Sequence, residues 1–292
     1  MIETRLQETT MGPGHLACAG CGAAVAMRHA LEALGPETYV VVPAGCWSTF
    51  IGVYPHTCLS VPVMSVAFAT TAATASGLKA GLDVAGREGA TVLAWAGDGG
   101  TFDIGLQALS GAAERNEDII FVCYDNEAYM NTGVQRSSAT PQGTVTTTTP
   151  ASAPKPQEKK DIISIMAAHR IPYAATAAIA FPDDLMAKLS RARSIRGTKF
   201  IHLFASCPTG WRHETHISIE VAAKAVASRV FPLYEVFEGR SWSLSPMPDK
   251  VGVSDYLSDQ GRFRNMSTEE MKLFQEAVDG RWEELLKKSE QG

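Results

Sequence analysis

The chain has 292 residues, of which 45% are hydrophobic and 20% charged, and its formal net charge is −5 at pH 7. This length can bury the core of one large α/β domain, or of one domain with appendages. The acidic balance argues against nucleic acid as the main partner. The first residues lack the apolar stretch of a secretory leader, and no run of about 20 apolar residues predicts a membrane span. We therefore expect a cytoplasmic protein.

The first two thirds of the sequence alternate between patterns typical of helices and of strands. Helices are predicted over Gly22–Leu34, Ser65–Val84, Asp103–Arg115 and Asp183–Ile195. Strands are predicted over Tyr39–Pro43, Thr91–Ala96, Ile119–Tyr124 and Lys199–Ala205. The second and third strands are continuous apolar runs, which is typical of strands buried on both faces of a parallel sheet. This order predicts an α/β fold, with helices on both faces of a mostly parallel sheet.

Two segments depart from this alternation. Residues 141–160 are rich in Thr and Pro and predict a long loop. After Arg229 the pattern is irregular until Ser267–Glu270, a capping box that opens a terminal amphipathic helix. The apolar face of that helix would contain Leu273, Phe274, Trp282 and Leu285. We therefore divide the chain into an α/β domain, residues 1–228, and a C-terminal extension, residues 229–292. The extension is interpreted as an intersubunit arm, although a helix docked on its own chain is equally economical.

A single acid stands among glycines in the run AWAGDGGTFDIG, residues 94–105. Asp98 follows one predicted strand, and Asn126 follows the next, 28 residues later, about what one βαβ crossover needs. Because the carboxyl ends of parallel strands meet at one edge of a sheet, the two side chains should lie together. Carboxylate, amide and carbonyl oxygens suit Mg²⁺, and a helix N-terminus at this edge suits a diphosphate. Two unrelated surface turns are the alternative.

The sequence contains six cysteines and no secretory leader, which suggests a reducing compartment where thiols serve metals or catalysis. The run CAGC, residues 18–21, is compatible with a redox dithiol, zinc or an iron–sulfur cluster. Cys46 and Cys207 each follow a predicted strand, beside Gly or Pro. Cys123 lies within a strand and is interpreted as a core residue. Cys58 is interpreted as a small buried residue, or otherwise as a substitute ligand.

Five segments in one order carry a resemblance to a known family. They read GHLACAGCG, AGCWS, GDGGTFDIG, YDNEAYMNTG and SCPTGW. The GDG and the later Asn are similar to the thiamine diphosphate motif. The whole set resembles the β subunit of the pyruvate/2-oxoacid:ferredoxin oxidoreductase family, which binds thiamine diphosphate and a [4Fe-4S] cluster. The resemblance covers most of residues 12–235 and implies the thiamine diphosphate-binding fold.

The resemblance also implies roles for individual residues. Mg²⁺ would be held by the side chains of Asp98 and Asn126 and the carbonyl of Ala128. The backbone would approach the diphosphate at Gly97, Gly99 and Gly100. Further residues expected against the cofactor are Ala23, Cys46, Tyr129 and Asn131. One [4Fe-4S] cluster would be bound by Cys18, Cys21, Cys46 and Cys207. Asn131 would reach the reacting centre as a hydrogen-bond donor, and a helix N-cap is the alternative.

The activity that the resemblance implies is oxidative decarboxylation of a 2-oxoacid. Thiamine diphosphate would carry the carbanion chemistry, coenzyme A would take the acyl group, and the cluster would pass electrons toward ferredoxin. The sequence offers no candidate for the glutamate that activates thiamine, so we expect a partner α subunit with a pyrimidine-binding domain. A CoA-binding γ subunit and a ferredoxin-like δ subunit are the other implied partners. The chain alone should then be inactive.

Several alternatives stay open at this point. Pyruvate is the default substrate, but oxalate, phenylglyoxylate, branched-chain 2-oxoacids and 2-oxoglutarate are also compatible with the family. A thiamine-dependent decarboxylase or carboligase without electron transfer would not need the four cysteines. A zinc-stabilised, non-catalytic binding subunit would be colourless and contain zinc. His15, His29, His169 and His202 belong to no pattern that singles one out, and we expect them to be structural.

Overall fold

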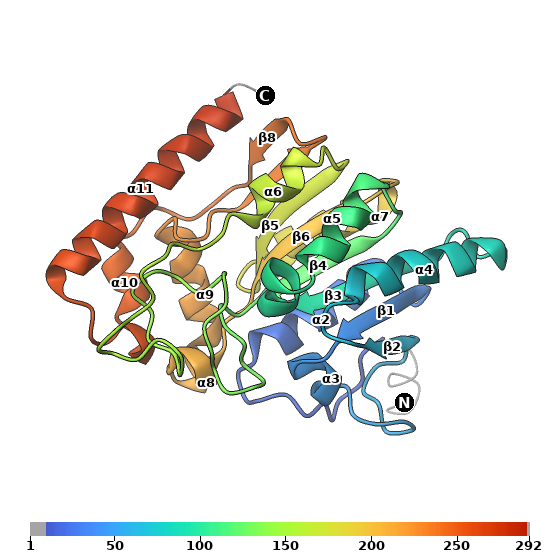
Figure 1. Ribbon diagram of the computed structural model, residues 1–292, viewed down its shortest axis with the longest axis horizontal. Coiled ribbons are helices and arrows are strands. Elements are labelled where there is room, and N and C mark those ends of the chain that lie inside the picture. The colour runs from blue at the N-terminus through green and yellow to red at the C-terminus, as the bar shows by residue number, and fades with distance from the viewer. Residues whose placement is uncertain (1–9, 291–292) are drawn as a thin grey trace.

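The computed structural model describes residues 10–290, which form one eight-stranded sheet with helices around it (Figure 1). The strands are β1 (Thr38–Pro43), β2 (Val63–Val66), β3 (Thr91–Gly97), β4 (Ile120–Asp125), β5 (Tyr173–Ala178), β6 (Lys199–Phe204), β7 (Tyr234–Phe237) and β8 (Ser241–Leu244). Their order across the sheet is β2-β1-β3-β4-β6-β5-β7-β8. The strands from β2 to β5 in this order are parallel, and β7 is antiparallel to both of its neighbours, β5 and β8. The mostly parallel sheet expected from the sequence is confirmed.

The α-helices pack on both faces of the sheet. They are α2 (Gly22–Leu34), α3 (Cys46–Phe50), α4 (Thr71–Val84), α5 (Leu106–Glu114), α6 (Ile162–Ala168), α7 (Pro182–Ser194), α8 (Pro208–Trp211), α9 (Ser218–Ala227), α10 (Val253–Leu257) and α11 (Thr268–Glu290). Successive residues of β1 show the division, because Val40 and Val42 join the core beneath α2 and α7, whereas Val41 joins the core beneath α4 and α5. No helix in residues 10–290 is long and apolar enough to cross a membrane.

Two predicted helices have different bounds in the structure. The predicted helix Ser65–Val84 begins only at Thr71, because the residues before it form β2 and pair with β1. The predicted helix Asp103–Arg115 begins only at Leu106, as α5, and a π-helical turn, Gly99–Asp103, precedes it. Gly105 lies at the junction, where a Cβ would be 1.9 Å from the carbonyl oxygen of Gly100, so only glycine fits. Strand pairing and close backbone packing therefore decided both boundaries.

The C-terminal residues pack on their own chain. β7 and β8 extend the sheet, and α10 and α11 follow. The predicted capping box is present, because the hydroxyl of Ser267 donates to the Glu270 carboxylate at 2.7 Å and accepts the Glu270 N–H at 3.2 Å. α11 buries Phe274 and Leu285 as expected, but Leu273 is 55% exposed because it lies outside the buried stripe. The division at residue 228 and the role as an intersubunit arm stay predictions.

Burial along α2 gives a test of the packing. Leu31 is fully buried in the core, whereas Val25 on the same helix is 36% exposed. We expect Leu31→Ala to lower the free energy of unfolding by about 2–5 kcal/mol, because it leaves a cavity. Val25→Ala should change it by less than about 0.5 kcal/mol. Urea unfolding of the full chain measures both changes, and equal losses would contradict this orientation of the helix.

Candidate functional site

Two neighbouring strands bring the predicted acid and amide to one edge of the sheet. β3 and β4 are parallel, and Gly97 lies opposite Tyr124 in their register. Asp98 directly follows the last residue of β3, and Asn126 directly follows the last residue of β4. Both residues are buried, with 1% and 7% of their surface exposed. The parallel arrangement thus places both polar side chains at the carboxyl end of the sheet, as expected.

Three oxygen atoms converge between these strand ends. The amide oxygen of Asn126 lies 3.0 Å from a carboxylate oxygen of Asp98 and 3.0 Å from the carbonyl oxygen of Ala128. Rotation of the amide by 180° would instead let its NH₂ group donate to both neighbours. In an octahedral Mg²⁺ site with bonds of about 2.1 Å, adjacent ligand oxygens lie about 3.0 Å apart. The first orientation therefore fits a bound cation, and the rotated one fits the chain without metal.

The backbone beside these oxygens carries no side chains. A Cβ at Gly99 would lie 2.1 Å from the ring of Tyr129, and Cβ atoms at Gly97 and Gly100 would lie 3.3 and 3.2 Å from aromatic rings. The Tyr129 hydroxyl donates to the Asp103 carboxylate at 2.6 Å, which fixes the ring over the glycine. Glycine is thus required at residue 99. Because the glycines of this turn carry no side chains, a diphosphate could approach its backbone closely. The ring of Tyr129 packs against Gly99 of this turn.

The charge of Asp98 has no adjacent cation on this chain among the residues described. The hydroxyl of Ser137 donates to its second oxygen. Burial raises the pKa of Asp98 well above its usual range, and the negative charge of Asp125 raises it further. A buried carboxylate is stabilised in its charged form by a metal ion or another cation. Mg²⁺ at the three convergent oxygens would supply that charge.

The four cysteines that the resemblance singled out line one cavity of about 190 Å³. They come from three segments of the chain, of which the run CAGC supplies Cys18 and Cys21 and the other two supply Cys46 and Cys207. Asn126 and Asn131 line the same cavity, so it adjoins the convergent oxygens. Within residues 10–290, no three His, Cys, Asp or Glu side chains gather closely enough for a single metal ion. The thiols therefore surround a shared space and do not meet at one point.

The environment of these thiols favours their neutral form. Burial raises the pKa of Cys46 to about 12 and that of Cys207 to about 11, and the neighbouring cysteines add to both shifts. The Cys207 sulfur also accepts the N–H of Gly210 at 3.4 Å. Iron would reverse this preference, since a coordinating thiol is deprotonated. Cys58 and Cys123 are buried in the two hydrophobic cores, apart from this cavity.

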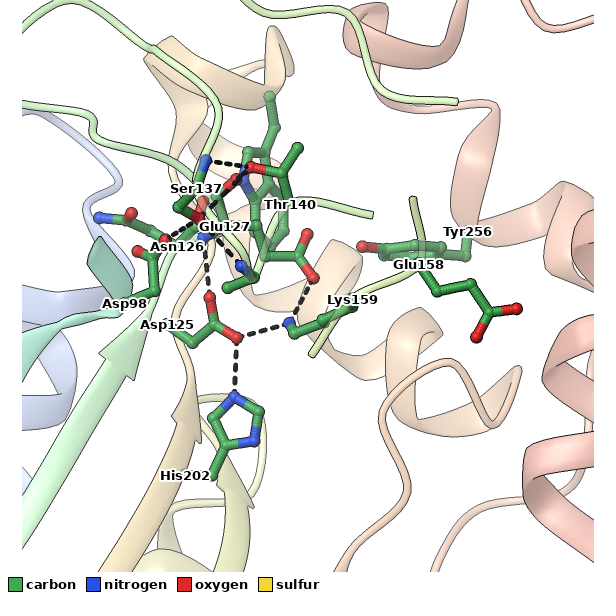
Figure 2. A network of polar contacts seen from close by, with 12 residues as sticks. Asp98, Asp125, Asn126, Glu127, Ser137, Thr140, Glu158, Lys159, His202 and Tyr256 are labelled. Carbon is green, nitrogen blue, oxygen red and sulfur yellow. Dashed lines mark hydrogen bonds and ion pairs between the residues drawn. The ribbon is translucent and has the colours of Figure 1, made fainter. Parts of the chain in front are cut away.

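A buried network of charges lies behind Asn126 (Figure 2). The carboxylate of Asp125 contacts Nζ of Lys159 at 2.5 Å and Nε2 of His202 at 2.7 Å. Lys159 also contacts Glu127 at 2.8 Å, and Arg262 contacts the other oxygen of Glu127 at 2.6 Å. Burial alone would raise the pKa of Asp125, but Lys159 and His202 hold it down to about 2. The two acids thus face two charged side chains, Lys159 and Arg262, while burial lowers the pKa of His202 and favours its neutral form.

Sequence reasoning missed this network, apart from assigning His202 a structural role. Glu127 is 135 residues from Arg262, and Asp125 is 77 residues from His202. No short motif can signal pairs at such separations. The one local hint is the charged end of the Thr/Pro-rich loop, which supplies Lys159. The network is therefore a product of the tertiary fold.

The remaining predicted residues lie around the same edge. Ala23 is buried in the first turn of α2 and lines the cysteine cavity. Asn131 also lines it but is exposed, and it follows the Tyr129 ring by two residues. The structure thus brings all the predicted site residues to one end of the sheet. Their individual roles stay predictions.

Comparison with known proteins gives a consistent family. Residues 43–203, more than half of the chain, match the family described as thiamine pyrophosphate enzyme, C-terminal TPP binding domain. Ketoisovalerate oxidoreductase subunit VorB of Pyrococcus horikoshii is 48% identical over 287 residues, covering 95% of this chain and 92% of VorB. Pyruvate synthase subunit PorB of Methanothermobacter marburgensis is 45% identical over 282 residues, covering 96% and 98%. The chain belongs to the β subunits of 2-oxoacid:ferredoxin oxidoreductases.

A solved structure supports the fold of this oxidoreductase subunit. The 2-oxoglutarate:ferredoxin oxidoreductase from Magnetococcus marinus superposes with a TM-score of 0.59 at 21% identity, covering 73% of this chain and 78% of that chain. At this identity the likeness shows the fold alone. The thiamine diphosphate-binding α/β fold and membership of an oxidoreductase, both expected from the sequence, are confirmed.

The Thr/Pro-rich loop of the oxidoreductase subunit, residues 141–160, contains no helix or strand, as predicted. A buried lysine in this loop hydrogen-bonds its backbone. Lys155 is 1% exposed, and its ammonium group donates to the carbonyls of Gln157 and Glu158 at 2.6 and 2.9 Å. Burial lowers the pKa of Lys155 to about 8, and nearby Arg136 lowers it further. The lysine thereby fixes the part of the loop that enters the charge network.

This shift predicts a pH dependence. Between about pH 8 and the ordinary lysine pKa of about 10.4, the unfolded chain binds more protons at Lys155 than the folded chain does. The free energy of unfolding should therefore rise with pH in this window. Lys155→Met should reduce the rise, whereas Lys272→Met on the exposed surface of α11 should not. Urea midpoints at about pH 7.5 and 9.5 measure this, and identical slopes for wild type and Lys155→Met would contradict it.

Proposed function

We propose that the chain binds thiamine diphosphate through Mg²⁺, carries a [4Fe-4S] cluster and takes part in CoA-dependent oxidative decarboxylation of a 2-oxoacid. The carrying observation is that the three convergent oxygens adjoin the cavity lined by the four cysteines. Asn126 belongs to both, so a cofactor held at the oxygens would lie beside a cluster held by the thiols. An electron donor and an acceptor would then be neighbours.

The proposed cofactor ligands follow from the oxygens and the bare turn. Asp98, Asn126 and Ala128 would hold Mg²⁺, and the backbone of Gly97, Gly99 and Gly100 would face the diphosphate. Thiamine diphosphate, when bound, supplies the nucleophilic carbon and the electron sink for decarboxylation. Ala23, Cys46 and Tyr129 would lie against it. Asn131, on the rim of the cavity, would donate a hydrogen bond to the substrate.

The cysteine set supports a cluster better than the zinc alternative. A single tetrahedral zinc requires its ligands to meet at about 2.3 Å from one point. The four thiols instead line a cavity of about 190 Å³, and no tight three-residue site occurs in residues 10–290. A [4Fe-4S] cluster takes four separate thiolates around a larger body. Cys18, Cys21, Cys46 and Cys207 would hold it, and electrons would leave through it toward ferredoxin.

The substrate is proposed as a small 2-oxoacid, with pyruvate as the default and a branched-chain 2-oxoacid as the second candidate. The second candidate follows from the 48% identity to a ketoisovalerate oxidoreductase subunit, beside 45% to a pyruvate synthase subunit. Phe50, Met130 and Val134 supply an apolar wall to the cysteine cavity. This wall is compatible with either acyl group.

Other subunits are part of the proposal. Relatives of the chain are named as subunits of oxidoreductases. We infer partners that supply the pyrimidine-binding domain, the CoA site and a ferredoxin-like electron acceptor. Val53 and Tyr54, which are 76% and 92% exposed, flank the segment that holds Phe50 of the cavity. Apolar side chains so exposed support a partner contact near the site.

The cluster predicts a coloured protein. Purified anaerobically with its partners, the subunit should be brown and add about four iron atoms per chain. Cys46→Ala and Cys207→Ala should lower the iron content and the broad visible absorbance assigned to this subunit. Cys58→Ala is the matched control, because Cys58 lies in the core and not in the cavity. A colourless chain that contains zinc would contradict the proposal.

Activity should require the assembled complex. We expect decarboxylation with CoA and a low-potential dye to be absent with the chain alone and present with all subunits. A panel containing pyruvate, 2-ketoisovalerate, 2-oxoglutarate, oxalate and phenylglyoxylate would identify the substrate from the ratio of kcat/KM values. Full turnover by the isolated chain would contradict the proposed division of labour between subunits.

A further inference from the structure

Glu127 separates two of the three convergent oxygens, because it lies between Asn126 and Ala128. Its backbone has a φ of 67°, in the left-handed region that residues other than glycine rarely adopt. Its N–H donates to the Asp125 carboxylate at 2.9 Å, and its carbonyl accepts the hydroxyl of Thr140 at 2.6 Å. Both peptide planes around Glu127 are therefore held. The next plane, which carries the Ala128 carbonyl, is held by the N–H of Tyr129, which donates to the carbonyl oxygen of Gln135 at 2.9 Å.

The side chain of Glu127 is held as firmly as its backbone. One carboxylate oxygen contacts Lys159 at 2.8 Å and the other contacts Arg262 at 2.6 Å. The guanidinium of Arg262 lies 4.0 Å from the ring centroid of Trp211. The indole N–H of Trp211 in turn donates to the carbonyl oxygen of Asn126 at 2.7 Å. The contacts of Glu127 thus lead, through Arg262 and Trp211, back to the backbone of Asn126.

The burial of these groups makes the arrangement sensitive to charge. Glu127 and Arg262 are each 1% exposed, so water cannot replace a lost partner. Lys159 comes from the Thr/Pro-rich loop and Arg262 from the C-terminal segment, and both converge on the same carboxylate (Figure 2 shows Lys159 between Asp125 and Glu127). A left-handed glutamate persists only where its surroundings over-determine it.

We propose that Glu127 is the positioning residue of the magnesium site. Its ion pairs with Lys159 and Arg262 hold the turn 126–128 so that the Asn126 amide and the Ala128 carbonyl face Asp98. The inference rests on the magnesium site proposed above, and it adds a residue that touches neither metal nor substrate. Groups that orient metal ligands change metal affinity by about 10- to 100-fold when they are removed.

The test uses Glu127→Gln in the assembled complex, stripped of Mg²⁺ and thiamine diphosphate. We expect the Kd for Mg²⁺, titrated with saturating thiamine diphosphate and followed by tryptophan fluorescence, to rise about 10- to 100-fold. KM for Mg²⁺ should rise by the same factor, while kcat at saturating Mg²⁺ stays within about twofold. Glu158→Gln is the matched control, because the side chain of Glu158 is 63% exposed and points away from Lys159 in Figure 2.

The outcomes separate the inference from the proposed function. If wild type binds no Mg²⁺ with thiamine diphosphate, the magnesium site itself is wrong. If wild type binds and Glu127→Gln binds equally well, the positioning role is overturned. A merely structural role would lower the thermal midpoint with and without cofactor alike and leave the Kd unchanged. Should Glu127→Gln fail to fold, Arg262→Lys keeps the charge but loses the stacking on Trp211. It should then weaken Mg²⁺ binding at least threefold, and an unchanged Kd would overturn the inference.

Discussion

The parallel pairing of β3 with β4 is the constraint on which the rest of the site depends. Parallel strands end at the same edge, and the register that sets Gly97 opposite Tyr124 leaves Asp98 and Asn126 facing each other beyond the sheet. The amide oxygen of Asn126 then lies 3.0 Å from two other oxygens, one of the Asp98 carboxylate and one of the Ala128 carbonyl. Oxygens at this spacing repel one another unless a proton or a cation lies between them. The site is therefore satisfied either by the rotated Asn126 amide, which donates to both oxygens, or by a cation bound between the three oxygens.

The basic side chains that the structure describes around the site pair with Asp125 and Glu127 but not with Asp98. Lys159 and Arg262 carry the positive charges that face Asp125 and Glu127, and His202 hydrogen-bonds Asp125, so the network behind the turn is balanced. No basic side chain contacts Asp98 in the described part of the chain, and burial raises the pKa of its carboxyl group. Asp98, buried beside this balanced network, is therefore suited to bind a metal ion that also binds an anionic ligand such as a diphosphate.

The C-terminal segment has a part in this site that its position in the sequence conceals. Residues after 228 continue the sheet through β7 and β8 and then carry Arg262 back to Glu127. The Thr/Pro-rich loop also contacts Glu127, through Lys159. Glu127, next to the convergent oxygens, is therefore paired with two segments that contain none of the family motifs. Because the partners of Glu127 are buried, their contribution depends on the whole fold being formed.

The sequence by itself determined the elements whose signals are local. The apolar period and the Gly-Pro stop predicted α2 with the bounds that the structure has, and two acceptors 28 residues apart predicted one edge of a parallel sheet. The sequence also indicated the cysteine ligands, because a CxxC motif and cysteines that follow predicted strands can be recognised without a structure. Tertiary structure alone decided β2, the π-helical turn Gly99–Asp103 ahead of α5, and the network around Glu127. These features depend on contacts between residues far apart in the chain, whose energy exists only after folding brings them together.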